Sequence, residues 1–210
     1  MAYFNESDID KLEHLFKINL INSCSGYKSA NLIGTTSESG LENVAVFSSI
    51  THIGSSPALF GFFLRPTTVI RNTYQNLKLS GFYTLNHVHK SIIKDAHHTS
   101  AKYDASISEF NMTHLKSEYK NNFPAPFVKG APIQIAMQFV EEYDIKANNT
   151  ILVIGKIVGL YIEDHLIEED GFVDLVKGEV AAINGLDGYA IPEEKVRFGY
   201  QRPKELIYGK

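Results

Sequence analysis

Residues 132–164 contain two long stretches with the alternating pattern of β-strands, PIQIAMQFVEEYDI and ILVIGKIVGLYIED, separated only by the short turn KANNT. In the first stretch Ile133, Ile135, Met137 and Phe139 recur at every second position, so they share one face of a strand. Two strands of this length joined by a tight turn form a long antiparallel hairpin. The hairpin predicts a mainly β fold.

Four shorter strands are predicted before this hairpin. The segments 29–37 and 43–51 flank the polar turn ESGLE and indicate a second hairpin. The segment 57–64, PALFGFFL, is too apolar to face water on either side, and 81–88 is a further strand. Six or more strands favour a closed or nearly closed antiparallel barrel, because closure removes exposed strand edges.

A helix is predicted between the third and fourth of these strands, over residues 68–79. Ile70, Tyr74 and Leu77 have the spacing of one helical face, and Gly81 follows as a stop signal. Residues 89–128 are polar and mixed, which predicts helix and loop after the fourth strand.

A short helix is also predicted at the start of the chain. Ser7 is the candidate N-cap, with Asp10 three residues later and an apolar stripe of Leu12, Leu15 and Phe16. With 44% hydrophobic residues, the 210-residue chain can bury a sizeable core, and we expect a single domain over 1–210. Its C-terminal tail is predicted to be irregular from about residue 178.

Composition argues against several functional classes. The net charge of −4 and the pI of about 6.1 disfavour a nucleic-acid partner, which usually requires a basic surface. Cys24 is the only cysteine, so no internal disulfide can form. The N-terminus has no signal-like pattern and no apolar run is long enough to cross a bilayer, so we expect a cytoplasmic protein with no membrane partner.

The stretch FFLRPTTVIRNTYQNL (62–77) is a candidate anion site. Arg65 would end a strand, Thr67 and Thr68 would begin a helix, and Arg71 would lie one turn further on the same face. A helix N-terminus attracts anions and arginine binds phosphate in a bidentate manner, so a phosphate could bind here. A threonine cap with two solvated arginines remains the alternative.

A second candidate site follows the strand NVAVF. Val46, Phe47, Ser48 and Ser49 could line a flat ligand, because small side chains let a planar ring approach the backbone; a solvated strand is the alternative. No metal site is predicted, since the histidine pairs of the chain lack a carboxylate or cysteine that would complete a ligand set. No catalytic nucleophile can be assigned from the sequence.

Ordered motifs in this region resemble the flavin reductase-like, FMN-binding split-barrel family, and later motifs resemble its flavoredoxin-like branch. The similarity extends over residues 15–192. The stretches that carry it are 43–48, 56–59, 73–77, 81–86, 97–110, 125–145 and 185–194.

The resemblance implies an FMN site, with the phosphate held between Arg65 and Thr73 and the isoalloxazine ring against residues 46–49. Asn72 replaces a charged residue common in the family, which leaves open which side chain contacts the phosphate. The family also implies a homodimer and hydride transfer from NAD(P)H to the flavin N5, with electrons passed on to an acceptor or a partner oxygenase. Residues that could face the substrate are His98, Ser100, Lys102 and Tyr103.

Two other functions stay open at this point. The protein could bind FMN without catalysis, as an electron relay, store or sensor. It could also be a dimeric scaffold that has lost flavin, although the arginines and threonines of 65–73 argue against this.

Overall fold

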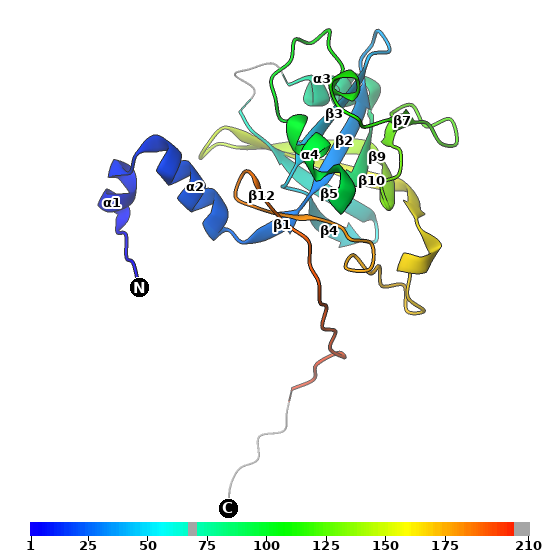
Figure 1. The fold of residues 1–210 in the computed structure, drawn as a ribbon. Helices are drawn as coiled ribbons and strands as arrows, with labels where there is room; N and C mark the ends of the chain where they lie inside the picture. Colours follow the sequence, from blue (N-terminus) through cyan, green and yellow to red (C-terminus); the bar gives the residue numbers. More distant parts are fainter. Residues whose placement is uncertain (67–70, 204–210) are drawn as a thin grey trace, which may run out of the picture.

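The computed structural model describes residues 1–66 and 71–203. Its centre is a seven-stranded antiparallel sheet in the order β3-β2-β6-β9-β10-β5-β4 (Figure 1). The strands are β2 (Asn31–Thr36), β3 (Glu42–Phe47), β4 (Thr51–Ser55), β5 (Ala58–Leu64), β6 (Phe82–His87), β9 (Ile133–Ile145) and β10 (Thr150–Ile162).

The sheet is curled, and its two edge strands, β3 and β4, belong to one continuous segment of the chain. β3 and β4 are consecutive in sequence and are joined by residues 48–50, but among the described residues they form no ladder with each other. The segment 43–51, predicted as one strand, therefore bends at Ser48. The bend leaves the barrel open along one side.

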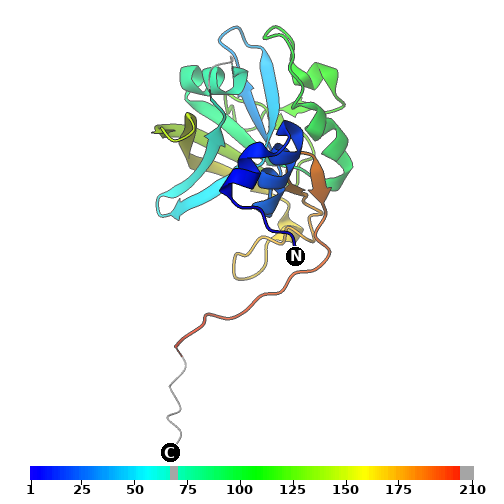
Figure 2. The ribbon, with the colours of Figure 1, turned by 90° about the vertical axis from the view of Figure 1, so that its left-hand side faces the viewer.

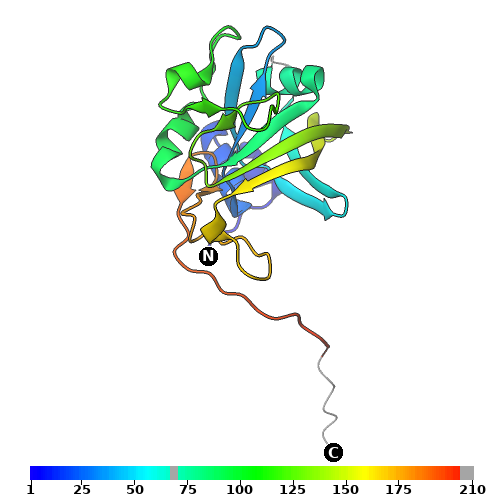
Figure 3. The ribbon, with the colours of Figure 1, turned by 90° about the vertical axis from the view of Figure 1, so that its right-hand side faces the viewer.

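The predicted long hairpin is confirmed by the pairing of β9 with β10, whose register runs from Thr150 opposite Ile145 to Ile162 opposite Ile133 (Figure 3). The face predicted to be apolar points into the barrel. Ile133, Ile135 and Met137 are buried there, and Phe139 packs against them. The same core contains Phe62 on β5 and Tyr83 on β6, two strands that are not paired in the sheet, and their rings meet edge to face across the barrel.

The helix between β5 and β6 is α3 (Asn72–Ser80), which packs on β2 and β3. Gly81 ends it with a left-handed conformation, φ 75°, as the sequence predicts. Its start differs from the prediction, since Arg71 is the N-cap rather than a residue one turn inside the helix. Thr67 and Thr68 lie outside the described residues.

The chain opens with two short helices, α1 (Glu6–Lys11) and α2 (His14–Cys24), so the prediction of one helix capped by Ser7 is wrong. Asn5 caps α1 instead, because its side chain accepts from the Asp8 N–H and the Asp8 carboxylate accepts in return. Neither helix contains a buried residue. In Figure 1 they project to one side of the barrel, and in Figure 2, turned by 90°, they stand in front of it, so they lie outside its core.

Shorter elements close the ends of the barrel. They are η1 (Lys90–Ile92), α4 (Ile93–His98), α5 (Glu109–Met112), β7 (Ser117–Glu118), β8 (Phe127–Val128) and η2 (Asp164–Leu166). β1 (Tyr27–Ser29), β11 (Ala182–Asn184) and β12 (Gly188–Ala190) form a separate small sheet, so two strands lie within the segment predicted to be irregular.

After β12 the described chain leaves the body without regular structure (Figure 1). It is held near its start by Lys195 and Arg197, which pair with Glu168, Asp170 and the buried Asp174 in the segment 168–174. In the part of the chain with coordinates, no helix has the length and apolar character needed to span a membrane.

Candidate functional site

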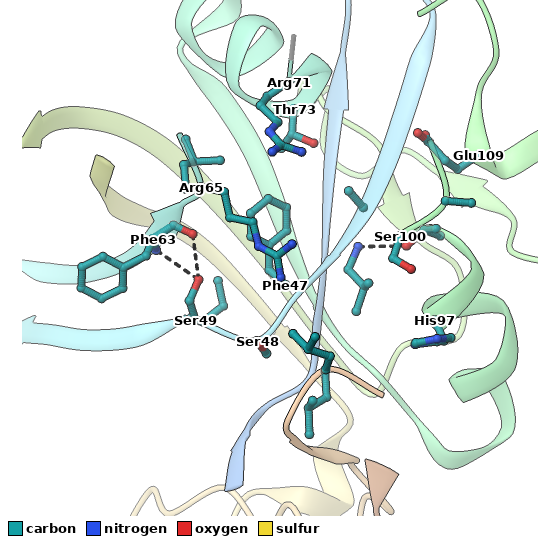
Figure 4. A pocket seen from close by; sticks show the side chains of 18 of the residues that line it. Phe47, Ser48, Ser49, Phe63, Arg65, Arg71, Thr73, His97, Ser100 and Glu109 are labelled. Carbon is teal, nitrogen blue, oxygen red and sulfur yellow. Dashed lines mark hydrogen bonds between the residues drawn. The ribbon is translucent and has the colours of Figure 1, made fainter. Parts of the chain in front are cut away.

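A cavity of about 1140 Å³ opens at the split between β3 and β4 (Figure 4). Its walls come from distant parts of the chain: the end of β3 with residues 48–50, the end of β5, the start of α3, and residues 97–105. The N-terminal segment 25–29 and the loop after β11 complete the lining. The fold thus brings residues 46–49 and the described ends of the second candidate segment, Arg65 and 71–73, to one cavity.

The end of β3 is fixed from both sides. The Val46 N–H donates to Thr99 Oγ1 at 2.9 Å, and Thr99 is itself almost fully buried. Ser49 Oγ donates to the carbonyl of Phe63 on β5 at 3.0 Å and accepts from its N–H at 3.1 Å. Phe47 packs edge to face on Phe62 in the core, with ring centroids 5.3 Å apart. This backbone is therefore a rigid wall with few side chains over it.

The start of α3 forms the cationic end of the cavity. Arg71 has an extended conformation and makes no side-chain cap, so no side chain among residues 1–66 and 71–203 caps the first N–H groups of the nine-residue helix. Arg71 is half-buried, and its buried Nε has no hydrogen-bond partner among the described residues. Positive helix-dipole charge and an unpartnered guanidinium N–H together favour an anionic ligand.

Arg65 lies on the same side of the cavity, where Figure 4 shows its side chain below that of Arg71. None of the ion pairs found between described residues involves either arginine. Lys28 and Lys102 also line the cavity, against only two carboxylates, Asp104 and Glu109. A cavity lined by more cations than anions, in a chain with net charge −4, attracts anions locally.

A buried polar network backs the start of α3. Glu109 Oε2 accepts from Asn43 Nδ2 at 2.7 Å and from the Val44 N–H at 3.1 Å. Asn43 Oδ1 in turn accepts from the hydroxyls of Thr35, at 3.2 Å, and Thr73, at 3.0 Å. The Thr73 hydroxyl is thus engaged within the protein, which leaves the backbone N–H of Thr73 as its group for a ligand.

The opposite wall carries aromatic and histidine side chains. His97 Nδ1 lies 3.3 Å from the Tyr189 hydroxyl, with the two rings edge to face, and both line the cavity. Burial raises the pKa of Tyr189. His98 contacts the Tyr103 hydroxyl at 2.5 Å but is not part of the lining. No three His, Cys, Asp or Glu side chains gather at a metal-binding distance in residues 1–66 and 71–203.

Most residues predicted for the site line this one cavity. They are Val46, Phe47, Ser48, Ser49, Arg65, Arg71, Thr73, Ser100, Lys102 and Tyr103. His98 does not, and its neighbour His97 takes that place. Sequence reasoning missed Glu109 and Thr99, since nothing in the polar segment 89–128 marks them as partners of a strand. Asn43 had a signal, because it begins the strand motif NVAVFS.

Comparisons with known proteins agree with this architecture. Residues 24–177 match the family model described as flavin reductase like domain. A structure from Shewanella frigidimarina NCIMB 400, assigned as a flavin reductase with split barrel domain, is 41% identical. The alignment covers 96% of this chain and 100% of that chain, with a TM-score of 0.92. The predicted mainly β split-barrel fold is thereby confirmed.

Two more distant structures share the fold. Nitrilotriacetate monooxygenase component B from Bacillus cereus is 17% identical with a TM-score of 0.80, covering 94% of this chain and 98% of that one. An FMN-binding protein from Thermus thermophilus, with bound 1-cyclohex-2-enone, is 16% identical with a TM-score of 0.70. That alignment covers 83% of this chain and 92% of that one. A search of the curated proteins finds no match.

Proposed function

Since the chain belongs to the flavin reductase-like domain family, we propose that it is an FMN-dependent oxidoreductase that takes electrons from NAD(P)H. The observation that carries the proposal is that Arg71, whose buried Nε has no partner among the described residues, lies in one cavity with the backbone wall at 46–49. A flavin mononucleotide has the matching shape, because a planar ring is joined to a single terminal phosphate.

The residues present fit the phosphate end of FMN. Arg71 offers a buried N–H without a partner among the described residues, and α3 offers beside it first-turn backbone N–H groups that its N-cap side chain does not bind. Arg65 lines the same cavity and would offer a second guanidinium. FAD carries an additional nucleotide, and no dinucleotide-binding motif occurs in the sequence to hold it. FMN is therefore the proposed native ligand.

The ring would lie along residues 46–49, where the wall is held rigid by Thr99 and by the Ser49 contact with β5. The bound flavin would supply hydride-transfer chemistry, so the protein has to bind, orient and shield it. Ser100, Lys102 and Tyr103 line the same cavity, and we propose that they face the incoming nicotinamide or electron acceptor. Their polar groups would orient it and exclude water.

The proposed function predicts a yellow protein whose visible flavin absorbance bleaches when NADH or NADPH is added without oxygen. Flavin released by heat should run as FMN on chromatography. If FMN binds but neither nicotinamide reduces it, the chain is a flavin-binding electron relay rather than a reductase. Recovery of FAD as the main species, or no flavin binding after FMN is added, would contradict the proposed cofactor.

We also propose that the protein is a homodimer. Helices α1 and α2 bury no residue, yet short helices are marginally stable unless an apolar face is packed. They expose Leu15, Phe16 and Ile21 to between 50% and 65%. Phe63, at the cavity rim, is 45% exposed on the outer face of β5. A second copy that covers these apolar side chains would also close the cavity.

The dimer proposal predicts that sedimentation finds a dimer at micromolar concentration, and that Phe16→Glu shifts it toward monomer. The buried charge of the new glutamate would oppose packing of an apolar surface. Lys11→Glu on the neighbouring helix, a charge change away from those apolar side chains, serves as the matched control. A wild-type monomer with flavin bound would rule the dimer out.

The electron acceptor is proposed only by class. The Bacillus cereus neighbour is component B of a monooxygenase, which makes a separate oxygenase one candidate consumer of reduced flavin. Free flavin or a ferric complex is the alternative acceptor. Oxidation of NADH with and without added free FMN distinguishes a flavin-releasing reductase, whose rate rises with added FMN, from one that keeps its flavin.

A further inference from the structure

The carboxylate of Glu109 determines the direction of every hydrogen bond in the network behind α3. An ionised carboxylate can only accept, so Asn43 must turn its NH₂ group toward Glu109. Its Oδ1 then faces the other way and can only accept from the hydroxyls of Thr35 and Thr73. One charge thus orients an amide and two hydroxyls.

This network reaches the first turn of α3. Thr73 is the second residue of the helix, two positions after Arg71, and it is buried. One turn later Asn76 Nδ2 donates to Thr35 Oγ1 at 3.0 Å, which makes a second link to the same group of side chains. The first bond along the helix runs from the Gln75 N–H to the Arg71 carbonyl at 3.0 Å. Holding Thr73 and Asn76 therefore holds the backbone at Arg71.

Burial of the Glu109 carboxyl group costs folding free energy. Glu109 is 6% exposed and has no ion-pair partner in the described part of the chain. Burial raises its pKa, against the opposing effect of the N–H of Val44 and the amide of Asn43. Because folding raises the pKa of this carboxyl, the free energy of unfolding of the protein falls as the pH rises and the carboxyl ionises. A contribution to stability therefore does not explain why a glutamate occupies this position, because its ionisation destabilises the folded state.

We propose that Glu109 is a positioning residue for the anionic ligand of the cavity, acting through Asn43 and Thr73 on the first turn of α3. The inference rests on the proposed phosphate site, since the helix start that it positions is the one assigned to the phosphate. In this proposal Glu109 does not contact the ligand itself. Its effect on binding is to keep the N–H groups of α3 and the Arg71 side chain aimed into the cavity.

The first test uses the protein without flavin, so it does not depend on the proposed cofactor. Amide hydrogen exchange at Gln75 reports whether the first turn of α3 is held. We expect Glu109→Ala to reduce protection there at least tenfold, and Glu109→Gln to restore most of it, because a glutamine oxygen can still accept from Asn43. The control is Glu118→Ala, which removes a half-buried carboxylate that likewise accepts from an amide, Gln134 Nε2.

The second test measures binding of FMN and riboflavin to the same variants. We expect Glu109→Ala to weaken FMN about tenfold and riboflavin by less than about threefold, with Glu109→Gln close to wild type. Equal weakening of both ligands, or a change no larger than in Glu118→Ala, would overturn the proposal. If wild-type protein binds no FMN, the proposed function fails, while the exchange result still decides whether Glu109 positions α3.

A third variant keeps the proposal testable if Glu109→Ala does not fold. Thr73→Val removes the hydroxyl at the far end of the network but keeps the side-chain shape and the backbone N–H. It should reproduce the selective loss of FMN affinity, because it removes the hydrogen bond by which Asn43 holds the first turn of α3. An unchanged ratio of FMN to riboflavin affinity in Thr73→Val would contradict the path through Asn43 and Thr73.

Discussion

Replacing Arg71 by alanine should weaken FMN binding roughly 10- to 100-fold and leave riboflavin binding nearly unchanged. A hydrogen bond to a charged group is typically worth about 1.5–3 kcal/mol, which corresponds to that range of affinity. The half-buried Arg71 side chain has a buried Nε without a partner among the described residues, so its removal breaks no internal bond found there. Riboflavin has no phosphate, so its affinity should stay nearly the same.

The measurement is a pair of fluorescence titrations, one with FMN and one with riboflavin, on wild type and variant. Arg71→Lys should give an intermediate loss, because lysine keeps the charge but not the bidentate geometry. Arg202→Ala, on the exposed C-terminal segment, is the matched control. If both ligands weaken equally in Arg71→Ala, the arginine supports the fold or the ring wall. If neither weakens, the phosphate binds elsewhere, and Arg65 becomes the next residue to test.

The sequence predicts the parts of this protein that depend on local pattern. The hairpin of β9 and β10 was predictable because alternation at 133–139 decides which face is buried. The end of α3 was predictable because Gly81 adopts a left-handed conformation that most side chains avoid. The grouping of 46–49 with 65–73 was predictable only as two separate candidates, which the resemblance to a known family joined.

The start of α3 was less predictable, because its boundary depends on tertiary contacts. Apolar periodicity from Ile70 suggested a helix beginning at residue 68, whereas the helix begins at Asn72. Thr73 is held by Asn43, a residue 30 positions earlier in the chain. Glu109 could not have been assigned at all, since its partner Asn43 is 66 residues away and no local pattern records that contact.

The cap and the packing of the N-terminal helices could not be predicted from local sequence patterns alone. Both Asn5 and Ser7 are good N-cap residues, and the choice of Asn5 depends on its reciprocal bond with Asp8. The stripe of Leu12, Leu15 and Phe16 predicts a helix with one apolar face. Leu15 and Phe16 are exposed in the single chain, which is why they enter the dimer proposal instead of the core.

Replacing Phe62 by alanine should lower the free energy of unfolding by about 3–5 kcal/mol, the cost typical of deleting a large buried aromatic ring. Phe62 is 1% exposed and lies between two aromatic partners, with ring centroids 5.3 Å from Phe47 and 5.7 Å from Tyr83. Urea denaturation of the flavin-free protein measures the change. Phe198→Ala, at an 82% exposed position on the C-terminal segment, should change stability by less than about 0.5 kcal/mol.

The same variant tests how the core supports the flavin wall. Phe47 ends β3 and packs on Phe62, so the cavity left by Phe62→Ala should loosen the backbone on which the ring is proposed to lie. FMN and riboflavin carry the same ring and should therefore weaken together, in contrast to the selective loss in Arg71→Ala. A folded Phe62→Ala protein that keeps full affinity for both ligands would show that the ring does not depend on the end of β3, and would move its proposed site to the opposite wall of the cavity.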